Sequence, residues 1–241
     1  MKSNNRKAAL SSLLLLVTLS WSYAHALYID TSSQGKAGQR QEVKVYYSEF
    51  ADGTVEKVAD WYSDVKEFQL WLVHPDGQKT ALETTAQEDH FTANFVPEKK
   101  GTYRLEISHT AEDPGEKTAY QFNTFAQVTV GKKASEIPLT NSGPELYLLE
   151  KPQPEKNAGS KTFVTYFKGE PMGGISATVF LPSGKTKEVE SNSEGLLPIE
   201  FSEKGIYFIE ATTFHEKEAG NTKKSPYESV WRCATQKLEI E

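Results

Sequence analysis

Five histidines are the residues of this chain with the widest chemical capacity, because neutral imidazole binds transition metals and titrates near neutral pH. They are scattered and form no short-spaced metal motif such as H-x-x-x-H or H-E-x-x-H. The five positions are His25, His74, His90, His109 and His215. Any metal site must therefore be assembled by the fold.

Three of these histidines are expected to share one end of the first folded unit. If its strands run alternately up and down, the chain start and two loops bring together His25, His90 and His109. A chain beginning at His25 would offer its α-amine and its ring together, a chelate that suits nickel, cobalt or copper. Four nearby carboxylates are secondary ligand candidates: Glu88, Asp89, Glu112 and Asp113. The alternative interpretation is a set of solvated loop histidines.

Two further candidate sites follow from the same topology. His74 and His215 are expected near the junction of two units, where they could share a second site. Trp61 and Tyr62 occupy a loop at the histidine end. This aromatic pair is expected either to contact a partner or glycan, or to plug the end of the core.

No catalytic motif accompanies these residues. The chain contains no G-x-S-x-G elbow, P-loop, dinucleotide fingerprint or EF-hand loop. Its single cysteine, Cys233, excludes a disulfide framework and is expected to be buried in a strand. A non-enzymatic protein is predicted.

Composition and charge narrow the class of protein. The 241 residues are 37% hydrophobic and 25% charged, with a formal net charge of −6. This is ordinary globular composition. An acidic chain without a basic stripe is a poor nucleic-acid binder, because phosphate neutralisation drives that binding.

The first 24 residues have the pattern of a removable export signal. Lys2, Arg6 and Lys7 precede an apolar run that is too short to span a bilayer comfortably. Cleavage is expected after Ala24 or after Ala26. The mature chain is predicted to be periplasmic and not to span the membrane.

The rest of the chain alternates apolar and polar residues with almost no helical periodicity. Alternation of this kind predicts half-buried strands, separated by turn signals such as Pro75-Asp76-Gly77. The predicted strands include 42–47, 68–73, 91–95 and 103–107. The expected fold is all-β, with two tandem antiparallel β-sandwich domains of immunoglobulin-like or transthyretin-like type.

A weak internal repeat supports the tandem arrangement. Gly101-Thr102-Tyr103 corresponds to Gly205-Ile206-Tyr207, and the turn at Pro75 corresponds to the turn at Pro182. The two offsets are nearly equal. A duplicated domain is therefore expected, with the tyrosine packing at the start of a strand.

The domain boundaries follow from these patterns and from a segment rich in Lys, Ser, Pro and Gly. That composition is typical of a semi-rigid linker. The predicted divisions are a signal peptide over 1–24, an N-terminal domain over 25–131, a linker with the start of the second domain over 132–154, and a C-terminal domain over 155–241.

The second domain carries turns that resemble those of the transthyretin-like or carboxypeptidase-regulatory sandwich. The stretch Gly169-Glu170-Pro171-Met172-Gly173-Gly174-Ile175 is similar to that group's Gly-x-Pro turn. The turn at 191–195 is also similar to that group's second turn.

Three other segments resemble an exported bacterial family often labelled as NikM-like periplasmic components of nickel or cobalt transport. They are His25 to Thr31, Trp61 to Val65 and Val230 to Thr235. The resemblance implies β-sandwich domains, export and transition-metal handling, with His25 as the mature N-terminus.

The expected function is a periplasmic binding or accessory protein for uptake of nickel, cobalt or copper. Its expected partner is a membrane transport component or an outer-membrane receptor. One alternative is a structural or interaction module that binds a partner protein or glycan. A second alternative is a copper-dependent oxidase that uses an N-terminal histidine.

Overall fold

The described residues form an all-β structure, as predicted. The computed structural model describes four segments of the chain, namely residues 25–50, 53–131, 143–151 and 159–241. These segments contain no α-helix, only two 3-10 turns, η1 (Val58–Asp60) and η2 (Val65–Glu67). The predicted signal peptide and much of the predicted linker lie outside the described residues.

The first unit packs a small sheet against part of a large central sheet. The small sheet contains β1 (Ala26–Asp30), β3 (Gln41–Glu49) and β8 (Phe91–Phe95), with β4 (Thr54–Val55) and β7 (Thr85–Ala86) at its edges. The central sheet receives β5 (Leu70–Val73), β6 (Lys79–Leu82), β9 (Gly101–Thr110) and β10 (Thr118–Val130), with β2 (Gln34–Gly35) beside β10.

The second unit repeats this arrangement. Its small sheet contains β11 (Leu146–Glu150), β12 (Ser160–Phe167) and β16 (Leu196–Glu200), with β13 (Glu170–Pro171) at the edge. It contributes β14 (Ser176–Phe180), β15 (Thr186–Glu190), β17 (Gly205–His215) and β20 (Ser229–Ile240) to the central sheet. A separate hairpin joins β18 (Gly220–Asn221) and β19 (Pro226–Tyr227).

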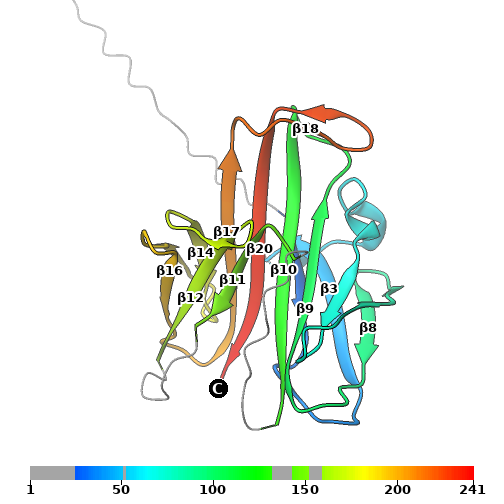
Figure 1. Ribbon diagram of the computed structural model, residues 1–241, viewed down its shortest axis with the longest axis vertical. Coiled ribbons are helices and arrows are strands. Elements are labelled where there is room, and N and C mark those ends of the chain that lie inside the picture. The colour runs from blue at the N-terminus through cyan, green and yellow to red at the C-terminus, as the bar shows by residue number, and fades with distance from the viewer. Residues whose placement is uncertain (1–24, 51–52, 132–142, 152–158) are drawn as a thin grey trace, which may run out of the picture.

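The last long strands of the two units pair in parallel and fuse them into one sheet. The register runs from Thr118 beside Ser229 to Phe125 beside Gln236. Figure 1 shows β17, β20, β10 and β9 side by side in the centre of the molecule. The prediction of two tandem domains did not include this junction. At the junction, the edge strand of each unit gains backbone hydrogen-bond partners that it would lack in an isolated domain.

The two small sheets lie on opposite faces of the central sheet. Side chains alternate between faces along a strand. On β10, Phe122 belongs to the first core, whereas Phe125 contacts Tyr147 of β11 with ring centroids 5.5 Å apart. On β20, Cys233 lies in the first core and Ala234 in the second. The central sheet is thus the middle of three layers, and Cys233 is fully buried as predicted.

An aromatic cluster anchors the first unit on the second. Phe50, just after β3, stacks on Phe208 of β17 with centroids 4.3 Å apart and planes 10° apart. Tyr28 of β1 meets the same ring edge-on at 5.4 Å, and Phe180 of β14 completes the cluster. The cluster covers the outer face of the second unit's sheet near the start of β17.

The repeated tyrosines occupy equivalent positions. The Tyr103 hydroxyl accepts the Lys99 backbone N–H at 3.0 Å and donates to the Lys99 carbonyl at 3.1 Å. The Tyr207 hydroxyl makes the same two bonds to Glu203 at the same distances. Each tyrosine ties the turn before its strand to the strand itself.

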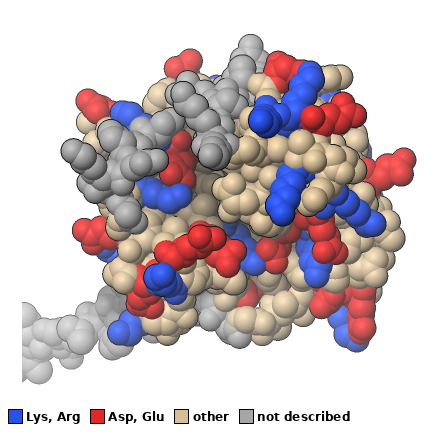
Figure 2. Space-filling view, turned by 90° about the horizontal axis from the view of Figure 1, so that it is seen from below, with Lys and Arg blue, Asp and Glu red and all other residues tan. Residues whose placement is uncertain are grey.

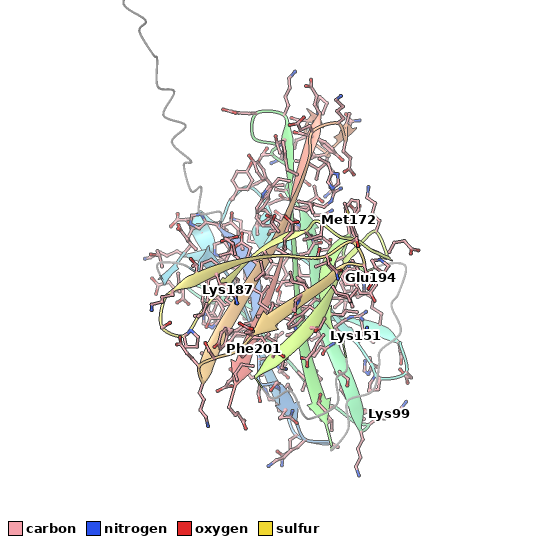
Figure 3. The ribbon with its side chains drawn as sticks, turned by 90° about the vertical axis from the view of Figure 1, so that its left-hand side faces the viewer. Lys99, Lys151, Met172, Lys187, Glu194 and Phe201 are labelled. Atoms are coloured by element: carbon pink, nitrogen blue, oxygen red, sulfur yellow. The ribbon has the colours of Figure 1, made fainter. Side chains whose placement is uncertain are left out.

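Gly173 lies where two turns of the second unit come close together. A Cβ on Gly173 would lie 2.2 Å from the Asn192 carbonyl oxygen, so only glycine allows this close approach of two turns. The Thr165 hydroxyl donates to the Met172 carbonyl and holds the same region. Figure 3 places Met172 and Glu194 near each other at one end of the second unit.

Candidate functional site

A groove lies between the two units, on the face of the central sheet that also carries the first unit's small sheet. Its volume is about 660 Å³, within the range of small-molecule sites. Strands β10, β20, β17 and β14 form its floor, and its walls are supplied by His25, by Tyr47 of β3 and by Tyr62 in the loop after η1. The aromatic cluster at Phe50 and Phe208 lies beyond one end.

Three aromatic side chains cross the floor in one row. Phe214 pairs with Trp231, and Trp231 pairs with Tyr120, so all three point to the same face. The Tyr120 and Trp231 rings are 6.0 Å apart at 61°. The Phe214 side chain is 55% exposed. This aromatic row therefore offers apolar surface that no described residue of the chain covers completely.

Glu210 marks the other end of the floor. It lies on the same face of β17 as Phe214, four residues earlier, which is about 13 Å along an extended strand. Its cross-strand neighbours are Thr178 and Thr235. Thr212 lies between the two ends. The groove therefore has an aromatic end, a polar middle and an end that carries the Glu210 carboxyl.

The Glu210 carboxyl is hard to ionise. Burial raises its pKa from 4.5 to about 7, and the carboxylates of Glu188 and Glu49 add to the shift. The cause is local, because Phe208 of the aromatic cluster lies two residues away on the same face of β17. Within the described residues, no donor or cation pairs with this carboxyl.

His25 and Tyr47 form one wall of the groove. The two rings stack with centroids 5.6 Å apart, and His25 Nε2 lies 2.7 Å from Glu56 Oε1. Tyr47 also meets Phe122 of the floor edge-on at 5.5 Å. Burial raises the pKa of the Tyr47 hydroxyl. His25 therefore lines the groove, and its ring contacts a carboxylate rather than another histidine.

The predicted aromatic loop divides between groove and core. Tyr62 lines the groove, meets Tyr120 edge-on at 5.9 Å, and donates its hydroxyl to the Asp113 carbonyl. Trp61 is only 3% exposed and packs against Phe68. Trp61 thus belongs to the core, as the plug interpretation expects, and only Tyr62 is available to a ligand.

The structure does not bring His90 to His25. His25 stacks on Tyr47, whereas His90 stacks on Tyr46 with centroids 5.1 Å apart. Tyr46 and Tyr47 are consecutive in β3, so their side chains point to opposite faces of the small sheet. His90 Nδ1 instead lies 2.6 Å from Asp89.

His109 has a partner of its own. Its Nε2 lies 3.3 Å from the Asp64 carboxylate, which also accepts the Glu112 backbone N–H at 2.7 Å. Burial raises the pKa of Asp64, but the Glu112 N–H and the His109 ring outweigh burial and lower it. This pair fastens the end of β9 to the loop at η2.

The other predicted carboxylate ligands are engaged with lysines. Glu88 pairs with Lys57 at 2.9 Å. Glu112 and Asp113 pair with Lys223 and Lys224 at 2.8 and 3.1 Å. Across the described segments, no group of three or more His, Cys, Asp or Glu side chains is placed to hold a metal ion. The three-histidine site stays a prediction that these contacts do not support.

His74 and His215 do not share a site. His74 follows β5, bonds Thr80 at 3.1 Å, and meets Tyr103 edge-on. His215 ends β17 and stacks on Phe167 at 4.8 Å. Three strands separate β5 from β17 in the central sheet, which places the two elements about 19 Å apart. The expectation of a shared junction site fails because the junction is formed by β10 and β20.

Sequence reasoning missed most of the groove's floor. One signal was present in β17. Glu210, Thr212 and Phe214 alternate with the buried residues of this strand, so they lie together on its other, partly covered face. What could not be read was the parallel pairing of β10 with β20, which puts Tyr120 beside Trp231. Trp231 packs against the first core and also lines the groove.

Charge on the rest of the surface is mixed. In the view of Figure 2, Lys and Arg alternate with Asp and Glu over one end of the molecule. Many of these charges are paired, as in the contact of Lys99 with Asp76 at 2.8 Å. Of the helical segments that are described, none has the length and apolar character to cross a membrane.

No protein-family model matches the chain, and no curated protein matches its sequence.

Proposed function

We propose that this chain is a non-catalytic binding protein whose ligand occupies the groove between the two units. The observation that carries the proposal is the aromatic row of Phe214, Trp231 and Tyr120 on the groove floor. Exposed aromatic rings in a concave site provide large apolar contact with defined geometry. The 55% exposure of Phe214 costs solvation free energy that a bound ligand would recover.

The surrounding groups suit recognition of a small molecule. Thr212 supplies a hydroxyl that can donate or accept, and the Thr178 hydroxyl, which donates to Glu188, can still accept. Glu210 supplies a carboxyl at the far end. A few polar groups among apolar walls fix orientation in sites of this size. The proposal keeps the predicted non-enzymatic binding protein and puts a small molecule in place of the expected metal, partner protein or glycan.

Fold identity and location are part of the same proposal. The first unit combines a five-stranded small sheet with five strands of the central sheet, and the second combines a four-stranded small sheet with four, which supports an immunoglobulin-like or transthyretin-like sandwich. The N-terminal pattern of positive and apolar residues supports export to the periplasm. In that compartment the groove would sample small molecules that enter through the outer membrane.

Transition-metal handling is a second candidate, favoured by one contact. His25 lies in the groove wall with its ring 2.7 Å from the Glu56 carboxylate. Cleavage after Ala24 would add an α-amine to this imidazole and carboxylate. Native mass spectrometry of the untagged exported protein tests this candidate, since the mass reports both the N-terminus and any retained nickel, cobalt or copper. A metal-free chain beginning at Leu27 would contradict it.

The binding proposal is tested with dansylamide, an uncharged aromatic probe whose fluorescence rises in apolar sites. Phe214→Ala and Trp231→Ala should each weaken its binding about tenfold, because each removes a ring from the floor. Val96→Ala is the matched control, since Val96 is also a large apolar residue, 51% exposed, on another part of the surface. Equal affinity of all four proteins, or no binding by any, would overturn the proposal.

A further inference from the structure

The two ends of the groove differ in chemistry, and the difference specifies a ligand. The aromatic row occupies one end, and Glu210 lies about 13 Å away on the same strand. Resting on the proposed function, we infer that the groove selects organic cations, with a ring for the aromatic row and an ammonium group for Glu210.

The charges around Glu210 are all of one sign. Glu188 of β15 and Glu49 of β3 are the two groups whose charge acts on it across space. Glu188 accepts a hydrogen bond from Thr178, and in the described segments no lysine or arginine pairs with Glu210. Glu210 thus lines the groove, and two further carboxylates act on the same end with charge of the same sign.

The positive groups near the groove are committed elsewhere. His25 is held by Glu56 at 2.7 Å, and Lys237, on the same face of β20 as Trp231, pairs with Asp30 at 2.7 Å. An anion placed beside Glu210 would meet carboxylates without a compensating cation. An ammonium group would instead gain a charge-assisted hydrogen bond in a partly desolvated place, where such bonds are strong.

The aromatic end also favours cations over anions. Ring faces are negative at their centres, so a positively charged or electron-poor ring is attracted to Trp231 and Tyr120. The chain already uses this contact elsewhere, where Lys79 Nζ lies 4.9 Å from the Trp71 ring. Both ends of the groove therefore discriminate in the same direction.

The probe dansylcadaverine matches this layout, because it joins a naphthalene ring to a primary amine through a flexible five-carbon chain. At pH 8 it should bind at least about tenfold more tightly than dansylamide, which has the ring without the amine. Dansylglycine, which carries a carboxylate, should bind more weakly than dansylamide.

The preference should depend on Glu210. In Glu210→Gln the affinities for dansylcadaverine and dansylamide should become equal, while the affinity for dansylamide stays as it was. Glu98→Gln is the matched control, since Glu98 is an exposed carboxylate far from the groove. Circular dichroism melting of each variant confirms that it is folded.

The outcomes separate the two proposals. If dansylamide and dansylcadaverine bind with equal affinity to the unaltered protein, or if Glu210→Gln keeps the preference, the cation inference is overturned and the binding groove stands. If neither probe binds, the proposed function itself fails. Tighter binding of dansylglycine would reverse the assigned ligand charge.

Discussion

At the scale of single residues, the molecule contrasts two glutamates in opposite surroundings. Glu210 lies among aromatic rings and carboxylates, and its pKa is raised to about 7. Glu218 binds Arg232 through two hydrogen bonds of 2.9 and 2.6 Å, and these bonds lower its pKa to about 2. One glutamate opposes folding when charged, and the other stabilises the fold only when charged.

Glu210→Gln should stabilise the protein at high pH alone. Below pH 4.5 the carboxyl is protonated in both the folded and the unfolded chain, so the variant gains nothing. Above pH 7 the variant should gain about 3 kcal/mol in unfolding free energy. The wild-type carboxyl ionises at a lower pH in the unfolded chain than in the folded chain, which favours unfolding, and glutamine removes this difference. Urea unfolding at pH 4 and pH 8 measures both values. An equal gain at the two pH values would contradict the desolvated carboxyl.

Glu218→Gln should act in the opposite sense. Arg232 is 2% exposed and also bonds Glu145, so removing the Glu218 charge leaves a buried guanidinium partly uncompensated. The loss should be about 2 kcal/mol at pH 7 and should disappear as the pH falls from 4.5 through 2, where the wild-type carboxyl is also protonated. Glu228→Gln is the control, because its partner Lys117 is exposed. A loss of the same size at pH 2 would contradict this account.

At the scale of elements, alternation and turn chemistry predicted several of the longer strands to within a few residues. The predicted segments 42–47, 91–95 and 103–107 correspond to β3, β8 and β9. The pairing of strands distant in sequence was not predictable, because a strand's free edge carries the same backbone groups whatever its partner. For this reason the sequence did not predict the sheet that the two units share, nor the residues that surround His25 and Glu210.

The repeated tyrosines offer a test of equivalence between the two units. Tyr103→Phe and Tyr207→Phe should each cost about 1 to 2 kcal/mol of unfolding free energy, because each leaves one turn N–H and one carbonyl without their partner. Tyr227→Phe, on the separate hairpin, is the comparison. Chemical denaturation of the three variants gives the values. A large loss for one repeat and none for the other would show that the two turns are not equivalent.

At the scale of the whole molecule, the parallel pairing of β10 with β20 makes the two units one folding body. The first unit's Leu27 carbonyl accepts the hydroxyl of Thr235 in the second unit, and Cys233 of β20 lies in the first core. Neither unit can unfold without exposing part of the other. The groove, built from both, should therefore persist until the whole protein melts.

Scanning calorimetry of the protein should accordingly show one transition, with equal calorimetric and van't Hoff enthalpies. The physical reason is that separation would expose the buried edges of β10 and β20 together with the aromatic cluster at Phe50. Two resolved transitions would contradict the single folding body.

The most direct test of the central claim is to locate a bound probe by nuclear magnetic resonance. Dansylamide titrated into the isotope-labelled protein should shift the Trp231 indole N–H and the backbone amides of 118–122 and 210–214, which form the groove floor. Shifts confined to other parts of the surface, or none at millimolar probe, would contradict a ligand groove between the two units.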